Sequence, residues 1–169
     1  KSANAITFVI NEKAYVVSGT NSSKYVWEYD PTLVSSEFNG WTRKKYLDKD
    51  NKWEDVQRED AIAFVISNKA YVATGKSGNY TSEVWEYNPT KDDWNEKTSL
   101  EYEIIAREDA VAFSLNNRGF FVTGASSGGY LGDMWEIIDA EYNKGLIGKY
   151  GKKLDTYKNY TNKYSGTYE

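Results

Sequence analysis

The fold of this chain is decided by the stretch Ala61-Ile-Ala-Phe-Val-Ile-Ser-Asn-Lys-Ala-Tyr-Val-Ala-Thr-Gly75, because the chain contains it three times in related forms. An earlier copy ends at Gly19 and a later one at Gly124, and each is followed by a polar loop and then a Trp-Glu pair. The three glycines lie 56 and 49 residues apart. A repeat of about 50 residues is what a four-stranded propeller blade requires.

Each copy predicts four short antiparallel strands, so the expected fold class is all-β. In the second copy the first strand is the apolar run Ala61–Ile66, the second is Ala70–Thr74 and the third is Glu83–Tyr87. The fourth begins near Trp94, after a turn that Pro89 imposes. Nine aromatic residues take equivalent places in the copies and are expected to be buried: Phe8, Phe64, Phe113, Tyr15, Tyr71, Phe120, Trp27, Trp85 and Trp135.

The pattern resembles the kelch repeat. The matching features are the apolar strand, the Tyr-Val-x-x-Gly strand, the Trp-Glu-Tyr-Asp/Asn-Pro segment and a Trp five residues beyond Pro89. The resemblance is closest to bacterial secreted or surface kelch proteins of the galactose oxidase-like kind, and it implies a secreted, periplasmic or cell-surface location. It also implies about three kelch-type β-propeller blades in residues 1–141, with repeats at about 1–57, 58–106 and 107–141.

Three blades are too few to close a propeller ring, because kelch propellers generally have about four to eight. We therefore expect the chain to be part of a larger propeller. Its partners would then include the remaining propeller blades, removed from this chain or supplied by another chain.

Residues 142–169 lie outside the repeat and form a basic, Tyr-rich C-terminal tail with six Lys and two acidic residues. The spacing of Tyr150, Leu154, Tyr157 and Thr161 indicates an amphipathic helix. The Asn, Thr, Tyr and Gly content of the tail is poor in helix formers. A helix, an added strand and a mobile tail all remain open for this segment.

The composition removes several kinds of chemistry. The chain has no His and no Cys, so it has no disulfides, thiol nucleophiles or imidazole bases. The galactose oxidase resemblance implies a copper centre with His and Tyr ligands and a Tyr crosslinked to Cys, which this chain cannot assemble. We expect no metal and no other cofactor.

Charge and hydropathy also limit the partners. Residues 1–141 carry 15 basic and 23 acidic side chains, which argues against binding to the phosphate backbone of a nucleic acid. The chain has no run of about 18 apolar residues, so no transmembrane segment is predicted. A protein or glycan ligand is the partner expected instead.

The candidate ligand-binding residues come from two kinds of loop. The loops after the glycines hold Tyr25, Tyr80 and Tyr130, with Asn79 beside the second of them. Because strands alternate in direction, these loops share an end of the blades with Arg58 and Arg107, which lead into first strands. The guanidiniums suit a carboxylate or sulfate, or they pair with acids of the blades as structural elements. The Tyr rings suit a sugar or peptide, or they fold onto the adjacent Trp residues.

The predicted function is a non-enzymatic kelch-type binding or scaffold module that presents loops to a protein or glycan. Glu28, Glu86 and Glu136 do not suggest catalysis, because a residue that recurs in every copy serves the repeat. The kelch resemblance also implies an alternative, a segment of a carbohydrate-processing propeller enzyme such as a sialic-acid mutarotase. Most of the Arg, Glu and Asn cluster that such an enzyme needs would lie outside this chain.

Overall fold

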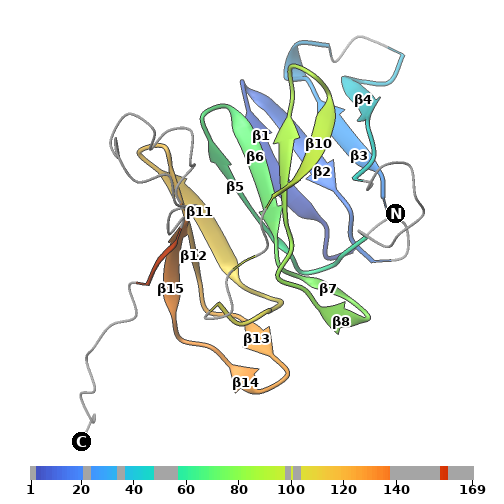
Figure 1. The fold of residues 1–169 in the computed structure, drawn as a ribbon. Coiled ribbons are helices and arrows are strands. Elements are labelled where there is room, and N and C mark those ends of the chain that lie inside the picture. The colour runs from blue at the N-terminus through green and yellow to red at the C-terminus, as the bar shows by residue number, and fades with distance from the viewer. Residues whose placement is uncertain are drawn as a thin grey trace, which may run out of the picture.

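Three antiparallel sheets of four strands stand side by side in the computed structural model of the chain (Figure 1). The structure describes residues 3–20, 24–33, 37–47, 57–97, 100, 104–137 and 157–159. Apart from one 3₁₀ turn, η1 (Pro31–Leu33), the regular elements in these ranges are all strands. The all-β fold class, built from blades of four strands, is confirmed.

Each sheet is a blade in which strands that follow one another in the chain lie side by side. Blade 1 consists of β1 (Ile6–Ile10), β2 (Lys13–Val17), β3 (Val26–Tyr29) and β4 (Trp41–Lys44). Blade 2 consists of β5 (Ile62–Ile66), β6 (Lys69–Ala73), β9 (Val84–Asn88) and β10 (Asp93–Lys97). Blade 3 consists of β11 (Val111–Leu115), β12 (Arg118–Val122), β15 (Met134–Ile137) and β16 (Tyr157–Asn159).

Two small hairpins interrupt the loops after the glycines, where the sequence predicted no strand. Blade 2 carries β7 (Lys76–Ser77) paired with β8 (Asn79–Tyr80). Blade 3 carries β13 (Ala125–Ser126) paired with β14 (Gly129–Tyr130). Strands of two residues are too short to leave a periodic signal in the sequence.

The fourth strand of blade 3 comes from the segment beyond the repeat. Trp135 of β15 lies opposite Asn159 of β16, and Ile137 lies opposite Tyr157. For these three residues the structure adopts the added strand, one of the alternatives that the sequence leaves open. The pairing gives partners to backbone N–H and C=O groups along the outer edge of β15, which an edge strand would leave unpaired.

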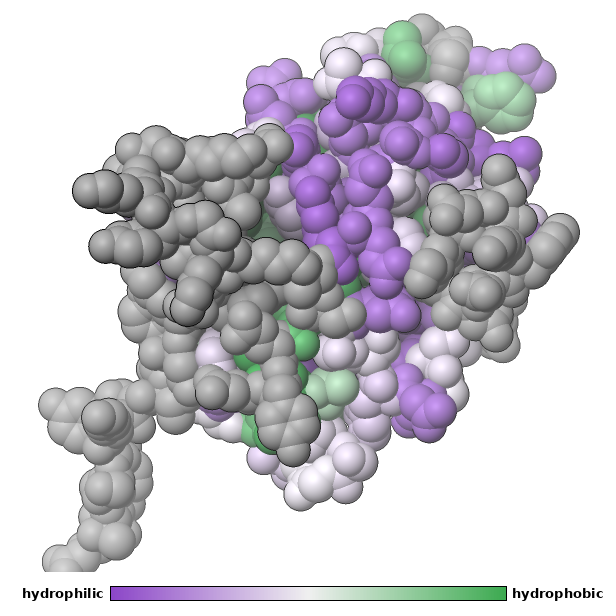
Figure 2. Space-filling model, in the orientation of Figure 1, coloured by the Kyte–Doolittle hydropathy of each residue, from purple (hydrophilic) through white to green (hydrophobic). Residues whose placement is uncertain are grey.

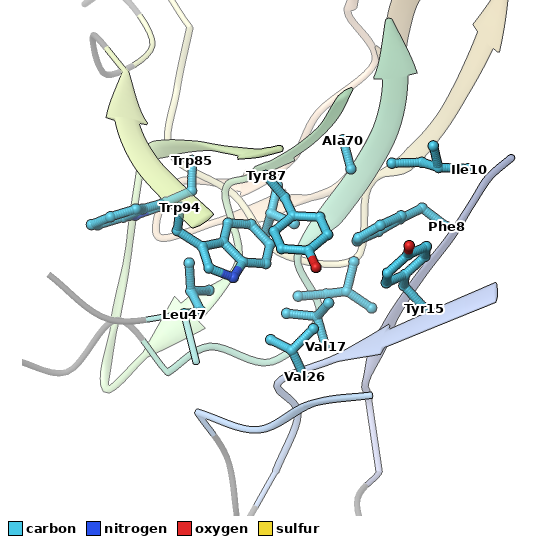
Figure 3. Packing of buried hydrophobic residues seen from close by; sticks show 12 residues of the cluster. Phe8, Ile10, Tyr15, Val17, Val26, Leu47, Ala70, Trp85, Tyr87 and Trp94 are labelled. Carbon is cyan, nitrogen blue, oxygen red and sulfur yellow. The ribbon is translucent and has the colours of Figure 1, made fainter. Parts of the chain in front are cut away.

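Blades 1 and 2 each pack the apolar face of their first strand against the next blade. In β1 the side chains alternate, so that Ile6, Phe8 and Ile10 are buried while Val9 between them is exposed. The buried residues join a cluster with residues of blade 2, of which Figure 3 labels Ala70, Trp85, Tyr87 and Trp94. The equivalent residues of blade 2 form a second cluster with blade 3: Ile62, Phe64 and Ile66 against Phe121, Trp135 and Ile137.

The expectation of equal burial is wrong for two of the nine aromatic residues, and Tyr15, Tyr71 and Phe120 are buried as expected. Phe8 and Phe64 are buried, but the equivalent Phe113 is 40% exposed. Trp85 and Trp135 are buried, but Trp27 is 40% exposed. The repeat alignment itself holds, because all three Phe rings stack on the residue opposite them in the second strand. Phe113 and Trp27 are exposed because each lies on a blade face that no other described blade covers.

Candidate functional site

The hairpins β7–β8 and β13–β14 project from the same end of blades 2 and 3, at the lower edge of Figure 1. We call this the loop end. Gly75 and Gly124 precede the hairpins with φ of +90° and +111°, in the region that favours glycine. A Cβ at Gly75 would lie 2.7 Å from the Glu59 carbonyl oxygen, and one at Gly124 would lie 2.8 Å from that of Glu108. These close approaches fix the path by which each hairpin leaves its blade.

Tyr80 ties its hairpin to the neighbouring blade. Its hydroxyl donates a hydrogen bond to the Glu108 carboxylate at 3.3 Å, and the Lys76 ammonium lies 5.3 Å from the ring centre. Lys76 also lies 3.7 Å from Glu108. The Tyr80 ring is half-buried, and the Asn79 side chain beside it is exposed.

Tyr130 takes the same place on blade 3 as Tyr80 on blade 2, but its surroundings differ. It ends the hairpin β13–β14 and is 95% exposed, the highest value among the large apolar and aromatic residues described. The Ser, Gly and Tyr residues around it give this end an intermediate hydropathy, pale in Figure 2, whereas strongly hydrophilic residues cover β10. An aromatic ring on a short hairpin is thus presented directly to solvent.

Tyr25 does not belong with the other two tyrosines, which corrects the grouping made from sequence. The backbone N–H of Ser18 donates to the Tyr25 carbonyl at 3.2 Å. The same bond in blades 2 and 3 goes to Glu83 and Asp133, so Tyr25 stands at the position of these two acids. Its ring packs edge-on against Tyr46, with centres 5.3 Å apart. The sequence grouping failed because the loop of blade 1 is shorter, which shifted the apparent match.

Arg58 is buried inside blade 2 and is not presented to a ligand. Its Nη2 donates to Glu83 Oε2 at 2.6 Å, and its Nη1 donates to the Thr74 carbonyl at 3.3 Å. Burial lowers the pKa of Arg58, and the charge and hydrogen bond of Glu83 act against that shift. This geometry supports a structural role for Arg58, which was the alternative to binding a ligand.

Arg107 makes the same kind of ion pair in blade 3, and its side chain is more deeply buried than that of Arg58. It is fully buried, its Nη2 donates to Asp133 Oδ2 at 2.7 Å, and its Nη1 donates to the Thr123 carbonyl at 2.8 Å. Burial would raise the pKa of Asp133, but hydrogen bonds from Arg107 and from Trp135 Nε1 hold it below its usual value. The two arginines therefore brace the blades, and neither guanidinium is exposed as a clamp for an anion.

The repeated glutamates Glu28, Glu86 and Glu136 form a second set of ion pairs within the blades. Their basic partners were not predicted from the sequence. Glu86 lies 3.3 Å from Lys69 and 2.9 Å from Lys97, and it accepts a hydrogen bond from the Tyr71 hydroxyl at 3.0 Å. Burial would raise the pKa of Glu86, but hydrogen bonds from Lys97 and Tyr71 and the charge of Lys69 hold it lower. The signal for these partners is a basic residue that opens the second strand of every blade: Lys13, Lys69 and Arg118.

Three equivalent residues, Asn4, Asp60 and Asp109, connect the blades in series. The Asp60 N–H donates to the Asn4 carbonyl at 3.3 Å, and the Asp109 N–H donates to the Asp60 carbonyl at 3.1 Å. All three have a positive φ, between 53° and 55°. Burial and the charges of Asp109, Glu59 and Glu108 raise the pKa of Asp60. Across the described ranges, His, Cys, Asp and Glu side chains form no group of three or more that could hold a metal ion.

An open, polar hollow of about 200 Å³ lies at the loop end between blades 1 and 2. Of the predicted site residues, Arg58 contributes to its lining, and the full lining is Gly19, Thr20, Gln57, Arg58, Glu59, Lys76, Ser77 and Gly78. Pockets for small molecules typically measure about 300–1,000 Å³, so this hollow is small for an enclosed site.

In the described part of the chain, no helix has the length and apolar character needed to cross a membrane.

No family model and no curated protein sequence matches this chain. Among solved structures, 146 chains match. One of them, YjhT, has a TM-score of 0.60 and 17% sequence identity, over 75% of this chain and 35% of the YjhT chain. The likeness supports a kelch-like β-propeller fold and, at this identity, shows the fold alone. The chain thus matches about a third of the length of YjhT.

Proposed function

We propose that this chain is a non-enzymatic kelch-type binding module of a bacterial secreted or surface protein, and that its loop end contacts a protein or glycan. The observation that carries the proposal is the pair of equivalent hairpins on adjacent blades, each with a Tyr at its end. Tyr130, on the second hairpin, is 95% exposed. The bacterial secreted or surface origin is supported by the sequence resemblance.

The loop end has the residue chemistry of a contact surface. Tyr supplies a large, rigid and amphipathic ring, while Ser, Gly and Asn supply adaptable hydrogen bonding. Asn79 and Tyr80 on one hairpin, and Gly129 and Tyr130 on the other, combine these residue types. Because the hairpins stand on strands of adjacent blades, the spacing between them is set by the rigid scaffold. A flat partner surface or an extended glycan fits this open geometry better than an enclosed small molecule.

The recurring Arg and Glu residues are engaged within the blades. Arg58 and Arg107 form buried ion pairs, and Glu86 is held in its ionised form by three partners. A general acid for neutral pH needs a raised pKa, which is the opposite of what holds for Glu86. These residues support a scaffold role for the blades and leave recognition to the loops.

One observation favours the alternative, a segment of a carbohydrate-processing propeller enzyme of the sialic-acid mutarotase kind. Asp60 combines partial burial with neighbouring acids that raise its pKa, a combination found at catalytic sites. Structural acid clusters perturb pKa values in the same way. The Asp60→Asn variant separates the two functions, because it should abolish sugar turnover in an enzyme and leave binding through the loop end intact.

A glycan array and an affinity pull-down, each with the wild-type chain and with Tyr130→Ala and Tyr80→Ala variants, test the proposal. Each substitution should weaken binding of the partner by about 1–3 kcal/mol. Phe38→Ala is the matched control, because Phe38 is 67% exposed in the connection between β3 and β4, at the opposite end of blade 1. A partner that still binds both Tyr variants but is lost on Phe38→Ala would refute the loop-end assignment.

A further inference from the structure

Arg43 differs from the other arginines of the chain in what it contacts. The other three each pair with a carboxylate of their own blade: Arg58 with Glu83, Arg107 with Asp133 and Arg118 with Glu136. Arg43 lies on β4, the outer strand of blade 1, and is exposed. Within the described part of the chain, no carboxylate pairs with it. A guanidinium without a carboxylate partner keeps its N–H groups available for an anion.

Two tyrosine rings hold this guanidinium in place. Its central carbon lies 5.8 Å from the ring centre of Tyr25 and 5.7 Å from that of Tyr46. The two rings pack edge to face, with centres 5.3 Å apart. The ammonium of Lys24 lies 5.2 Å from the Tyr46 ring centre and brings a second positive charge to the group. Such contacts restrain a guanidinium but offer it no oxygen acceptor. We call Lys24, Tyr25, Arg43 and Tyr46 the Arg43 site.

The Arg43 site lies at the loop end of blade 1 and is built on two adjacent strands. Tyr25 directly precedes β3, and Tyr46 follows the end of β4. Val26 at the start of β3 pairs with Lys44 at the end of β4, so the strand register brings the two segments together. A site held by paired strands has a better defined geometry than one held by a single loop.

A neighbouring blade on this face of blade 1 would not close the site. Arg43 and Glu96 are equivalent, because each lies opposite the Trp in the third strand of its blade. Tyr25 and Glu83 are equivalent, because each carbonyl accepts from the N–H of the residue before the glycine of its blade. Blade 1 covers this face of blade 2, yet Glu96 is exposed and the Glu83 side chain is 39% exposed. The site therefore stays open whether or not a further blade packs on blade 1.

The same comparison shows that the site is particular to blade 1. At the two equivalent positions blade 2 has the acids Glu83 and Glu96, whereas blade 1 has an aromatic ring and a cation, Tyr25 and Arg43. A residue that serves the repeat recurs in each copy, as the paired glutamates do. The change from two acids to Tyr and Arg instead reverses the charge at one place on an acidic molecule.

We propose that the Arg43 site binds the carboxylate of an acidic sugar, with the sugar ring packed on the exposed part of Tyr25. Arg43 donates two parallel hydrogen bonds to the carboxylate, as the guanidinium fork favours. Lys24 adds positive charge, and the Tyr25 ring, 37% exposed, contacts the C–H face of the sugar. The cations lie only 5.2–5.8 Å from the ring centres, which suits one sugar better than several side chains of an acidic peptide. This inference does not depend on the role proposed for the two hairpins.

Titration of the folded chain with methyl glucuronide, followed by two-dimensional NMR, tests the proposal. Methyl glucoside, in which a hydroxymethyl group replaces the carboxylate, is the matched ligand. Methyl glucuronide should bind in the millimolar range and methyl glucoside at least about tenfold more weakly, because only the glucuronide offers Arg43 an ionised partner. Its binding should weaken as the salt concentration rises. Equal binding of the two sugars, or no saturable shift with methyl glucuronide, would overturn the proposal.

Two substitutions that remove the same charge locate the site. Arg43→Gln should raise the dissociation constant of methyl glucuronide at least about tenfold. Lys91→Gln should leave it unchanged, because Lys91 is an exposed residue of the turn between β9 and β10, at the opposite end of blade 2. Arg43→Lys keeps the charge but not the fork, and it should also weaken binding. Equal losses in Arg43→Gln and Lys91→Gln would reduce the effect to net charge and refute the site.

N-acetylglutamate amide distinguishes a sugar carboxylate from that of an acidic peptide, because it carries one carboxylate and no sugar ring. It should bind more weakly than methyl glucuronide, and Tyr25→Ala should remove this difference by taking away the surface on which the sugar packs. Near-ultraviolet circular dichroism checks that each variant is folded, and Tyr25→Leu replaces Tyr25→Ala if that variant is not. An amide that binds as tightly as the sugar would assign the site to an acidic peptide and overturn the proposal.

Discussion

Blade 2 and blade 3 share a sequence pattern but differ in what covers them. Both faces of blade 2 are covered, one by blade 1 and one by blade 3, and its Phe64 is 1% exposed. Blade 3 is covered on one face only, and its Phe113 is 40% exposed. A repeat therefore specifies the shape of a blade, whereas the energetic role of each residue is set by the neighbouring blade.

The largest expected effect comes from the two equivalent phenylalanines. Phe64→Ala should lower the free energy of unfolding by about 3–5 kcal/mol, because it opens a cavity between two blades. Phe113→Ala should cost about 1 kcal/mol or less when the chain is dilute, since its ring already contacts water. Urea unfolding at a single low protein concentration measures both. Equal losses for the two variants would show that the Phe113 ring is covered by a neighbour other than blades 1 and 2.

The buried Arg–carboxylate pairs of blades 2 and 3 also differ in how deeply they are buried. Asp133→Ala leaves the fully buried Arg107 without its carboxylate and should cost about 3 kcal/mol of unfolding free energy. Glu83→Ala should cost less, because the Glu83 side chain is 39% exposed against 18% for Asp133, so water can replace more of its interaction with Arg58. Thermal and urea unfolding should agree on this order. The reverse order would mean that the pair in blade 2 is the more deeply desolvated one.

Glu86 should make the stability of blade 2 depend on pH. Its pKa is lowered in the folded state, so its contribution is present above the usual glutamate pKa and is lost as the pH falls through the lowered value. Glu86→Gln should therefore cost about 2 kcal/mol at neutral pH and progressively less in acid. Urea unfolding over this pH range measures the difference, with Glu37→Gln as the exposed control. A cost that stays constant with pH would contradict the ionic role of Glu86.

The smallest expected effect is a gain in stability at Asp60. Its pKa is raised in the folded state, so its charge opposes folding at neutral pH and ceases to do so as the pH falls through the raised value. Asp60→Asn should stabilise the chain by about 0.5 kcal/mol at neutral pH, with the gain vanishing in acid. Asn suits the site, because Asn4 holds the equivalent position with nearly the same φ. A loss of stability at neutral pH would show that the hydrogen bond that the Asp60 carboxylate accepts from the Asn4 side-chain amide, at 3.2 Å, outweighs the repulsion by the neighbouring acids.

The strands of the repeat could be predicted because their apolar residues recur with a fixed spacing. The predicted strand Ala61–Ile66 is found at Ile62–Ile66, and Ala70–Thr74 is found at Lys69–Ala73. The exposure of Phe113 could not be predicted, because it depends on a neighbour and not on the residue. For residues 142–169 the sequence left a helix, an added strand and a mobile tail open, because a strand as short as β16 carries too few residues to show a period of two.

The candidate site was harder to predict than the fold. Tyr80 and Tyr130 were placed correctly at one end of the blades, because antiparallel strands alternate in direction. Arg58 and Arg107 were placed at the same end, but their burial depends on acids at Glu83 and Asp133, which are a different residue type in each repeat. Recognising a shared role for Glu and Asp at one repeat position would have indicated these pairs from sequence.

The pairing of β16 with β15 has a consequence for the order of folding. Blades 1 and 2 take their strands from continuous stretches of the repeat, so they can form as soon as these stretches leave the ribosome. Blade 3 takes its last strand from Tyr157–Asn159, well beyond the end of β15 at Ile137. Two strands this far apart in sequence must come together before their contacts stabilise the blade, which slows folding. During that interval the edge of β15 is available to the strands of other nascent chains, so the time before Tyr157–Asn159 pairs with β15 is the period of greatest risk for misassembly of blade 3.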